Sequence, residues 1–242
     1  EEIKWGSFSH CSGLQGELVM PSKAKQIGSY SFEFCTGLTS LILNKNLTFI
    51  GHSSFSKCSG LSGQICIPET VMTISSNAFE YCSGFGKLTL LNKTVKSDSK
   101  IGIYSDAFQS CEGLKSVNFC EHLNFIGSRA FVNCSCLEGQ ISFPNLVDSV
   151  GEMAFKNCAR ISSVIFGNSV RTIGKSSFSF CQNLNRLYIS DSVVEIKERA
   201  FEFCGNLTTL FLGNSIQIIR NSAFFNCSKL SGRLVLSGNV SF

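Results

Sequence analysis

Apolar positions recur along this chain every 23 or 24 residues, a period far longer than a helical turn or the alternation of a strand. Each period opens on Phe-x-x-Cys, has an apolar residue three positions after the Cys, and then has two more separated by one residue. The Phe/Cys pairs are Phe8/Cys11, Phe32/Cys35, Phe55/Cys58, Phe79/Cys82, Phe108/Cys111, Phe131/Cys134, Phe155/Cys158, Phe178/Cys181, Phe201/Cys204 and Phe224/Cys227. Because alternation over a short stretch is typical of a strand with one buried face, each period is predicted to contain one short β-strand.

Three further features recur with the same period. Ile or Val lies five residues before each Phe, as in Ile27 and Ile173, and marks a second inward position. Ala or Ser directly precedes every Phe, which predicts a tight turn closely flanked by the next repeat. Three of the repeats carry an extra Gly and a closing Pro, as from Leu61 to Pro68, and the added residue indicates a β-bulge where the strand begins.

A unit of about 23 residues cannot bury its own apolar side chains, so the units are expected to stack. The predicted fold is an α/β, β-rich solenoid of about ten 23–24-residue coils. One parallel sheet is expected along one side, with either short turns or 3₁₀ or helical turns on the other. We expect residues 1–242 to form a single domain. Residues 91–100, within the one longer step between Phe79 and Phe108, are expected to form a polar loop.

The composite pattern from Ile173 through Phe178 and Cys181 to Ile189 resembles the leucine-rich repeat of BspA-like surface proteins, and the resemblance extends over all ten copies. It implies a right-handed leucine-rich repeat arc, placement at the cell surface or outside the cell, and adhesion to host proteins or cells. The family offers no catalytic motif and no cofactor, so the resemblance implies a scaffold and leaves the ligand open.

Ten of the 13 cysteines belong to the repeat, which favours buried packing over metal binding, although neighbouring coils lie close enough for disulfides. Cys66, Cys120 and Cys136 lie outside it and are the candidate exposed thiols. The three histidines, His10, His52 and His122, lie in separate coils. With no nucleophile–base pair, no metal-ligand spacing and no cofactor motif, the chain is expected not to be an enzyme.

The net charge of +4 is small and dispersed, which argues against nucleic acid as a partner. No run approaches the length of a membrane helix, so no direct membrane insertion is expected in this segment. Six Asn-x-Ser/Thr sequons, slightly more than chance would provide, are consistent with a secreted glycoprotein. They begin at Asn46, Asn92, Asn133, Asn206, Asn226 and Asn239.

One stretch of the outward-facing strand positions combines apolar and basic side chains. Ile165, Tyr188 and Phe211 are flanked by Arg186 and Arg233, a composition enriched at protein-binding hot spots. Aromatic and β-branched residues also suit strands without any binding role. The predicted function is a cell-surface recognition or adhesion module that binds a host protein or glycan on cells or matrix through this face. The alternative is a structural or self-associating stalk that presents another domain.

Neither end of the chain carries an evident capping unit, since Ile3 already occupies the position before the first Phe. We expect the chain to be a fragment of a longer array without terminal caps, or to associate end to end with a second copy.

Overall fold

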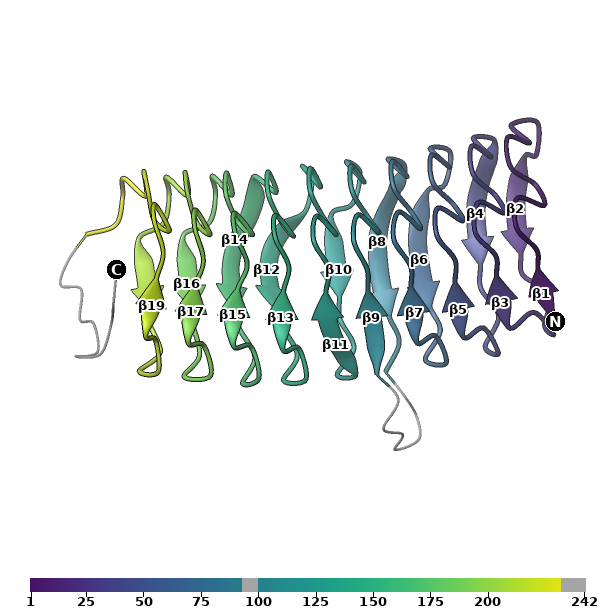
Figure 1. The fold of residues 1–242 in the computed structure, drawn as a ribbon. Coiled ribbons are helices and arrows are strands. Elements are labelled where there is room, and N and C mark those ends of the chain that lie inside the picture. Colours follow the sequence, from purple (N-terminus) through teal and green to yellow (C-terminus); the bar gives the residue numbers. More distant parts are fainter. Residues whose placement is uncertain (93–99, 232–242) are drawn as a thin grey trace.

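The chain folds into a row of stacked coils in a computed structural model that describes residues 1–92 and 100–231. Nineteen β-strands, all paired in parallel, account for the regular structure of the described residues. Figure 1 shows the coils side by side, with the N-terminus at one end of the row and β19 at the other. The predicted β-rich solenoid is therefore confirmed.

The two-to-four-residue strands before each Phe form one ten-stranded sheet, so the Ile/Val column is itself a sheet position. These strands are β1 (Glu2–Ile3), β3 (Gln26–Ile27), β5 (Phe49–Ile50), β7 (Thr73–Ile74), β9 (Ile101–Ile103), β11 (Leu123–Ile126), β13 (Ser149–Val150), β15 (Thr172–Ile173), β17 (Glu195–Ile196) and β19 (Ile218–Ile219). This differs from the expectation of a single sheet, because strands line two sides of the solenoid.

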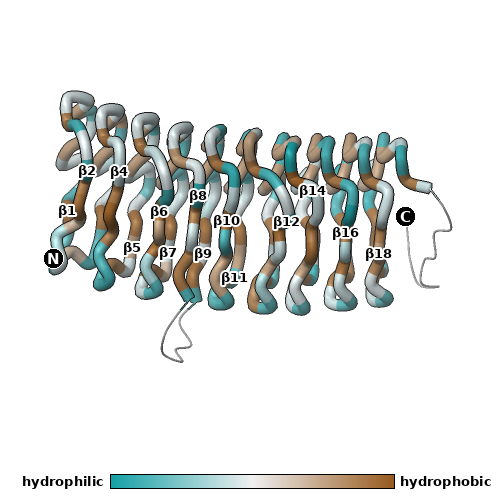
Figure 2. The backbone as a smooth tube through the Cα atoms, turned by 180° about the vertical axis from the view of Figure 1, so that it is seen from behind, coloured by the Kyte–Doolittle hydropathy of each residue, from teal (hydrophilic) through white to brown (hydrophobic). Residues whose placement is uncertain are grey.

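The strands after each Cys form three shorter sheets on the other side, visible from behind in Figure 2. They comprise β2 (Gly16–Val19) and β4 (Leu38–Ile42); then β6 (Gly63–Ile67), β8 (Phe85–Leu90) and β10 (Ser116–Asn118); then β12 (Glu138–Ser142), β14 (Arg160–Ile165), β16 (Arg186–Tyr188) and β18 (Thr209–Phe211). We call this side the strand face.

The glycine bulges explain where the strand face divides. Gly16, Gly63 and Gly139 have φ values of +83°, +73° and +78°, and the strand register shifts directly after each of them. Each of the three sheets has one of these bulged strands at its N-terminal edge. The predicted bulges are confirmed, and their unpredicted effect is to interrupt the ladder of backbone hydrogen bonds.

The turns between the two sides are short and contain no helix within the described residues, so the expected short turns are confirmed and the 3₁₀ or helical alternative is corrected. We call the Phe and Cys of each Phe-x-x-Cys pair the ladder Phe and the ladder Cys. The residue two positions before each ladder Phe and the residue two positions after it both have positive φ in all ten coils, as at Arg129 and Asn133. Two left-handed residues in so short a segment prevent helical hydrogen bonding from propagating. Alternate N–H groups donate to the next coil instead, as Phe131 N does to Ala154 O at 2.8 Å.

The core is a continuous ladder of ring, thiol and aliphatic columns. Successive ladder Phe rings stack with centroids 5.0–5.5 Å apart and planes within 11° of parallel. All are buried except Phe8 and Phe224 in the first and last coils. The strands β8 and β9 on either side of the polar insertion both pair with the neighbouring coils. Residues 93–99, most of the expected polar loop, lie outside the described residues.

Candidate functional site

The predicted binding residues on the strand face lie on three adjacent strands. Ile165 on β14 is in register with Tyr188 on β16, which is in register with Phe211 on β18. The Tyr188 and Phe211 rings stack with centroids 4.8 Å apart and planes 11° from parallel, and remain 36% and 53% exposed. The parallel register thus places these apolar side chains in one row.

Arg186 lies beside this row, since it pairs in register with Ser163 and Thr209, two residues before the row along the strands. Its side chain is exposed and forms no ion pair with another described residue. Arg233, the fifth predicted binding residue, lies outside the described residues. The structure therefore brings four of the five together.

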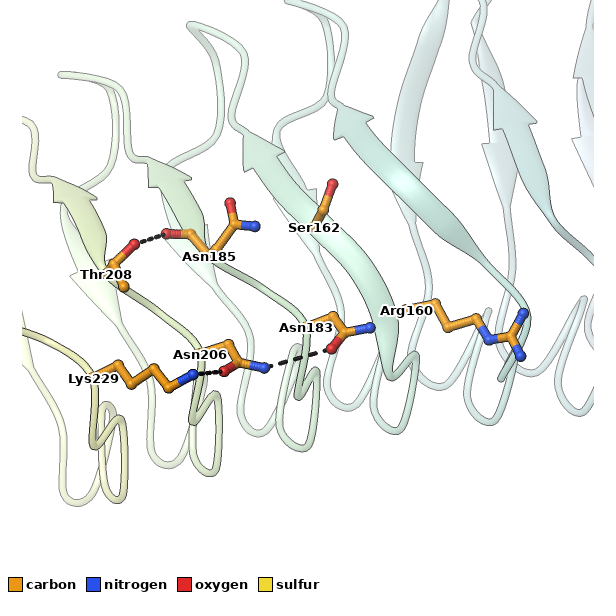
Figure 3. A pocket seen from close by; sticks show the side chains of 7 residues that line it. All are labelled: Arg160, Ser162, Asn183, Asn185, Asn206, Thr208 and Lys229. Carbon is orange, nitrogen blue, oxygen red and sulfur yellow. Dashed lines mark hydrogen bonds between the residues drawn. The ribbon is translucent and has the colours of Figure 1, made fainter.

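A shallow groove next to this row was not predicted from the sequence. It encloses about 440 Å³ and runs across the four C-terminal coils. Figure 3 shows its lining as two rows along the solenoid: Arg160, Asn183, Asn206 and Lys229 in one, and Ser162, Asn185 and Thr208 in the other. Every side chain that lines this groove is polar or charged.

A chain of hydrogen bonds orders the first row. Lys229 Nζ donates to Asn206 Oδ1 at 2.6 Å, and Asn206 Nδ2 donates to Asn183 Oδ1 at 3.5 Å. Both amide oxygens accept a hydrogen bond from within the row, so the Asn183 amide nitrogen is left with its donors facing the groove. The Arg160 guanidinium, at the opposite end from Lys229, forms no ion pair within the part of the chain that the structure describes.

The groove occupies the C-terminal coils because one position of the repeat changes from glycine to larger residues along the chain. The residue two positions after the ladder Cys is Gly in the first five coils and Cys136, Arg160, Asn183, Asn206 or Lys229 in the last five. A Cβ on Gly37, Gly60, Gly84 or Gly113 would collide with a carbonyl oxygen of the preceding coil. This switch from Gly to larger residues was the sequence signal that could have located the groove.

The three cysteines outside the ladder differ in exposure. Cys66 is exposed and lies 3.0 Å from the Gln64 side-chain nitrogen, and Cys136 is partly exposed. Cys120 is only 3% exposed, which corrects the expectation of an accessible thiol. It lies at the corner after β10, where Leu90 and Ile101 line the same narrow crevice and shield its sulfur.

The ladder thiols serve the backbone. None of the 13 cysteines is in a disulfide, and from Cys35 onward each ladder Sγ donates to the carbonyl oxygen of the preceding coil's Phe at 3.0–3.3 Å. Burial raises the pKa of Cys58 to about 12, and also raises the pKa of Cys82 and of Cys158. These thiols stay protonated at neutral pH and are poor nucleophiles.

The histidines do not assemble a reactive centre with these thiols. His10 stacks on Phe34 and His52 packs edge-on against Tyr30. His122 lines the crevice beside Cys120, whose free volume of about 10 Å³ is too small for any substrate. Among residues 1–92 and 100–231, no three metal-binding side chains gather, and no helix could cross a membrane.

The sequons are unevenly accessible. Asn46, Asn92 and Asn226 are exposed and Asn133 and Asn206 are partly exposed, whereas Asn239 lies outside the described residues. Asn133 and Asn226 both occupy the left-handed position before the ladder Cys, where Asn is favoured for its conformation. Asn206 lines the groove, so a glycan on its amide would exclude a ligand there.

The coil geometry and the ladder columns define the class of the protein as a leucine-rich repeat solenoid. The sequence profile of the BspA type leucine rich repeat region, in six copies, matches residues 1–137 and 101–231, and the chain belongs to this family. No protein with a curated description matches the chain.

Solved structures share the fold. The T. pallidum leucine-rich repeat protein TpLRR is 25% identical, with a TM-score of 0.60 over 69% of this chain and 78% of that one. A leucine-rich repeat protein from Bacteroides ovatus is also 25% identical, with a TM-score of 0.56 over 95% of this chain and 68% of its own. The pneumococcal vaccine antigen PcpA is 19% identical, with a TM-score of 0.53 over 95% of this chain and 58% of its own, and shows the fold alone.

Proposed function

We propose that the chain is a non-enzymatic recognition module, displayed at the cell surface or secreted, that binds a protein or glycan of host cells or matrix through its strand face. The observation that supports this best is the exposed, stacked pair Tyr188 and Phe211 in register with Ile165 and beside Arg186. Large aromatic side chains held rigidly by a sheet lose little conformational entropy on binding, and aromatic and Arg residues dominate hot spots.

The test compares two matched double variants. Tyr188→Ser with Phe211→Ser removes the aromatic pair, while Val19→Ser with Ile42→Ser removes an equally exposed, in-register apolar pair from β2 and β4. Binding to cultured mammalian cells and to plates coated with extracellular-matrix proteins should weaken by about 30-fold or more in the first variant, and stay at the wild-type level in the second. Thermal unfolding verifies that both variants fold.

A different result would favour the stalk. If wild-type chain binds neither cells nor matrix proteins, or if both variants bind as wild type does while the sedimentation coefficient changes in the aromatic variant, the row serves self-association and the recognition proposal is wrong.

A further inference from the structure

The strand face of the four C-terminal coils carries charge of one sign. From ladder Cys to the end of each strand, the segments 158–166, 181–189, 204–212 and 227–231 contain Arg160, Arg186 and Lys229 and no Asp or Glu. The acids of these coils lie on the return path, where Glu195, Glu198 and Glu202 pair with Arg220, Lys175 and Arg199. The strand-face cations are therefore available for a ligand.

The groove beside them is built to donate hydrogen bonds. Because Asn206 Oδ1 and Asn183 Oδ1 already accept bonds within the row, the groove presents the Asn183 Nδ2 protons and the remaining Lys229 protons. The Arg160 side chain lines the opposite end, and its guanidinium extends away from Asn183 along the solenoid (Figure 3). Ser162 and Asn185 add groups that both donate and accept, and the Thr208 hydroxyl, which donates to Asn185 O at 3.2 Å, adds an acceptor. Such a lining matches anionic groups spaced along a ligand that also carries many hydroxyls.

The direction of the groove selects a linear ligand. Its residues repeat once per coil, at the inter-strand spacing of about 4.8 Å, along the axis of the solenoid. An extended polysaccharide repeats its sugar units at a similar spacing, so one unit can meet each rung. A protein partner would favour large apolar or aromatic side chains at its centre, and no such side chain lines the groove.

We infer that the groove lined by Arg160, Asn183, Asn206 and Lys229 binds an extended acidic polysaccharide, one that carries carboxylate or sulfate groups. This inference rests on the proposed function and names the ligand class for the strand face. The Tyr188–Phe211 row then borders the bound chain. Since a glycan on Asn206 would fill the groove, the groove is competent only in chains that are unmodified at that residue.

The test measures heparin binding by calorimetry with unglycosylated protein made in a bacterial host, with uncharged dextran and poly-glutamate as comparison ligands. Heparin should bind, dextran should not, and poly-glutamate should bind at least about tenfold more weakly than heparin. Arg160→Gln with Lys229→Gln should weaken heparin binding by about tenfold or more. Lys25→Gln with Lys45→Gln, the same change in net charge at exposed positions outside the groove, should weaken it less than about threefold.

A second variant tests the donors of the groove at a single position, with a net-charge change of one against two in the Lys25/Lys45 control. Asn183→Asp keeps the size of the side chain but replaces its donors with an anion, and should weaken heparin binding by about tenfold. Equal loss in the Lys25/Lys45 control, equal affinity for poly-glutamate, or no loss in Asn183→Asp would each overturn the inference. If the Tyr188/Phe211 variant loses cell binding while heparin does not bind, the inference fails and the proposed function stands. If heparin binds in the groove but the chain binds no cells, the inference stands and the proposed function fails.

Discussion

The carbonyl oxygen of a ladder Phe accepts two hydrogen bonds, one from its own coil and one from the next coil. Phe131 O accepts from Cys134 N of its own turn at 3.3 Å and from Cys158 Sγ of the next coil at 3.1 Å. A carbonyl oxygen has two lone pairs. With a small apolar residue at the Cys position, only the backbone N–H of the same coil would donate to it, and the second lone pair would have no partner. Cysteine therefore combines a compact apolar volume with a weak donor, which accounts for its repetition.

Thiol accessibility follows directly from this arrangement. Under native conditions a thiol-specific reagent should modify Cys11 and Cys66 quickly and Cys136 more slowly, because these are the exposed or partly exposed thiols. Cys120 and the ladder cysteines from Cys35 to Cys227 should react only after unfolding. Mass spectrometry of the labelled peptides measures this, and rapid native labelling of Cys120 would contradict the burial described above.

Three ladder serines provide a second prediction at the residue scale. Ser31, Ser54 and Ser177 occupy the small-residue position before Phe, and their buried hydroxyls have no hydrogen-bond partner. Ser177→Ala should raise the free energy of unfolding by about 1 kcal/mol, because Ala fills the same position in other coils without burying a hydroxyl. Urea unfolding measures the change.

The control for that variant is two residues away. The equally buried Ser179 hydroxyl donates to Ser176 O at 3.1 Å, so Ser179→Ala should lower the free energy of unfolding by about 1 kcal/mol. Changes of the same sign at both positions would show that the unpaired hydroxyl is not the cause.

At the scale of the element, the turn and the bulge depend on left-handed backbone. Every turn has two residues with positive φ, and in 19 of these 20 positions the residue is not glycine. A non-glycine residue in this region costs about 1 kcal/mol or more, so the turns exist because inter-coil hydrogen bonds and Phe stacking offset that cost. Local propensity alone would not select this conformation.

The bulge at the start of β12 provides a test of the same cost. Gly139 has φ +78°, and no atom lies within 4 Å of the position that a Cβ would take. Gly139→Ala therefore strains only the backbone and should destabilise the chain by about 1–2 kcal/mol. Gly205 has no comparable φ and its nearest atom is 3.9 Å away, so Gly205→Ala should have little effect or be slightly stabilising. Equal thermal midpoints for the two variants would refute the argument.

At the scale of the whole molecule, buried thiols link stability to pH. In the unfolded chain a cysteine has a pKa of about 8.5, whereas burial raises the pKa of Cys58 to about 12 and that of Cys82, Cys111, Cys158 and Cys181 as well. Above pH 8.5 the unfolded chain binds fewer protons than the folded chain, so stability is full below this pH and falls as pH rises toward the folded values.

Each such thiol should lower the free energy of unfolding by about 1.4 kcal/mol per pH unit in this range. Urea unfolding with reductant present, between about pH 8.5 and 10, should therefore show a steep loss of stability. Cys158→Ser should reduce the slope by one thiol's share. A stability independent of pH in this range would contradict the prediction.

The sequence by itself determined the repeat, the inward columns and the bulges. Identical spacing of Phe, Cys and Ile or Val in every unit leaves stacking as the one way to bury them, so the solenoid and the row of Ile165, Tyr188 and Phe211 followed from periodicity. The spacing of the ladder cysteines, one per coil, also predicted their packing in the core. These features depend on positions that recur once per coil.

Only the tertiary structure decided what lies between coils. The second sheet, the thiol-to-carbonyl bonds, the burial of Cys120 at its corner and the donor-rich groove all involve partners about 23 residues apart or more, brought together by stacking. How these groups are oriented toward one another depends on φ values and on side-chain hydrogen bonds that no local pattern specifies. The columns could be counted along the chain, but what each column faces was set by the backbone path of the coil.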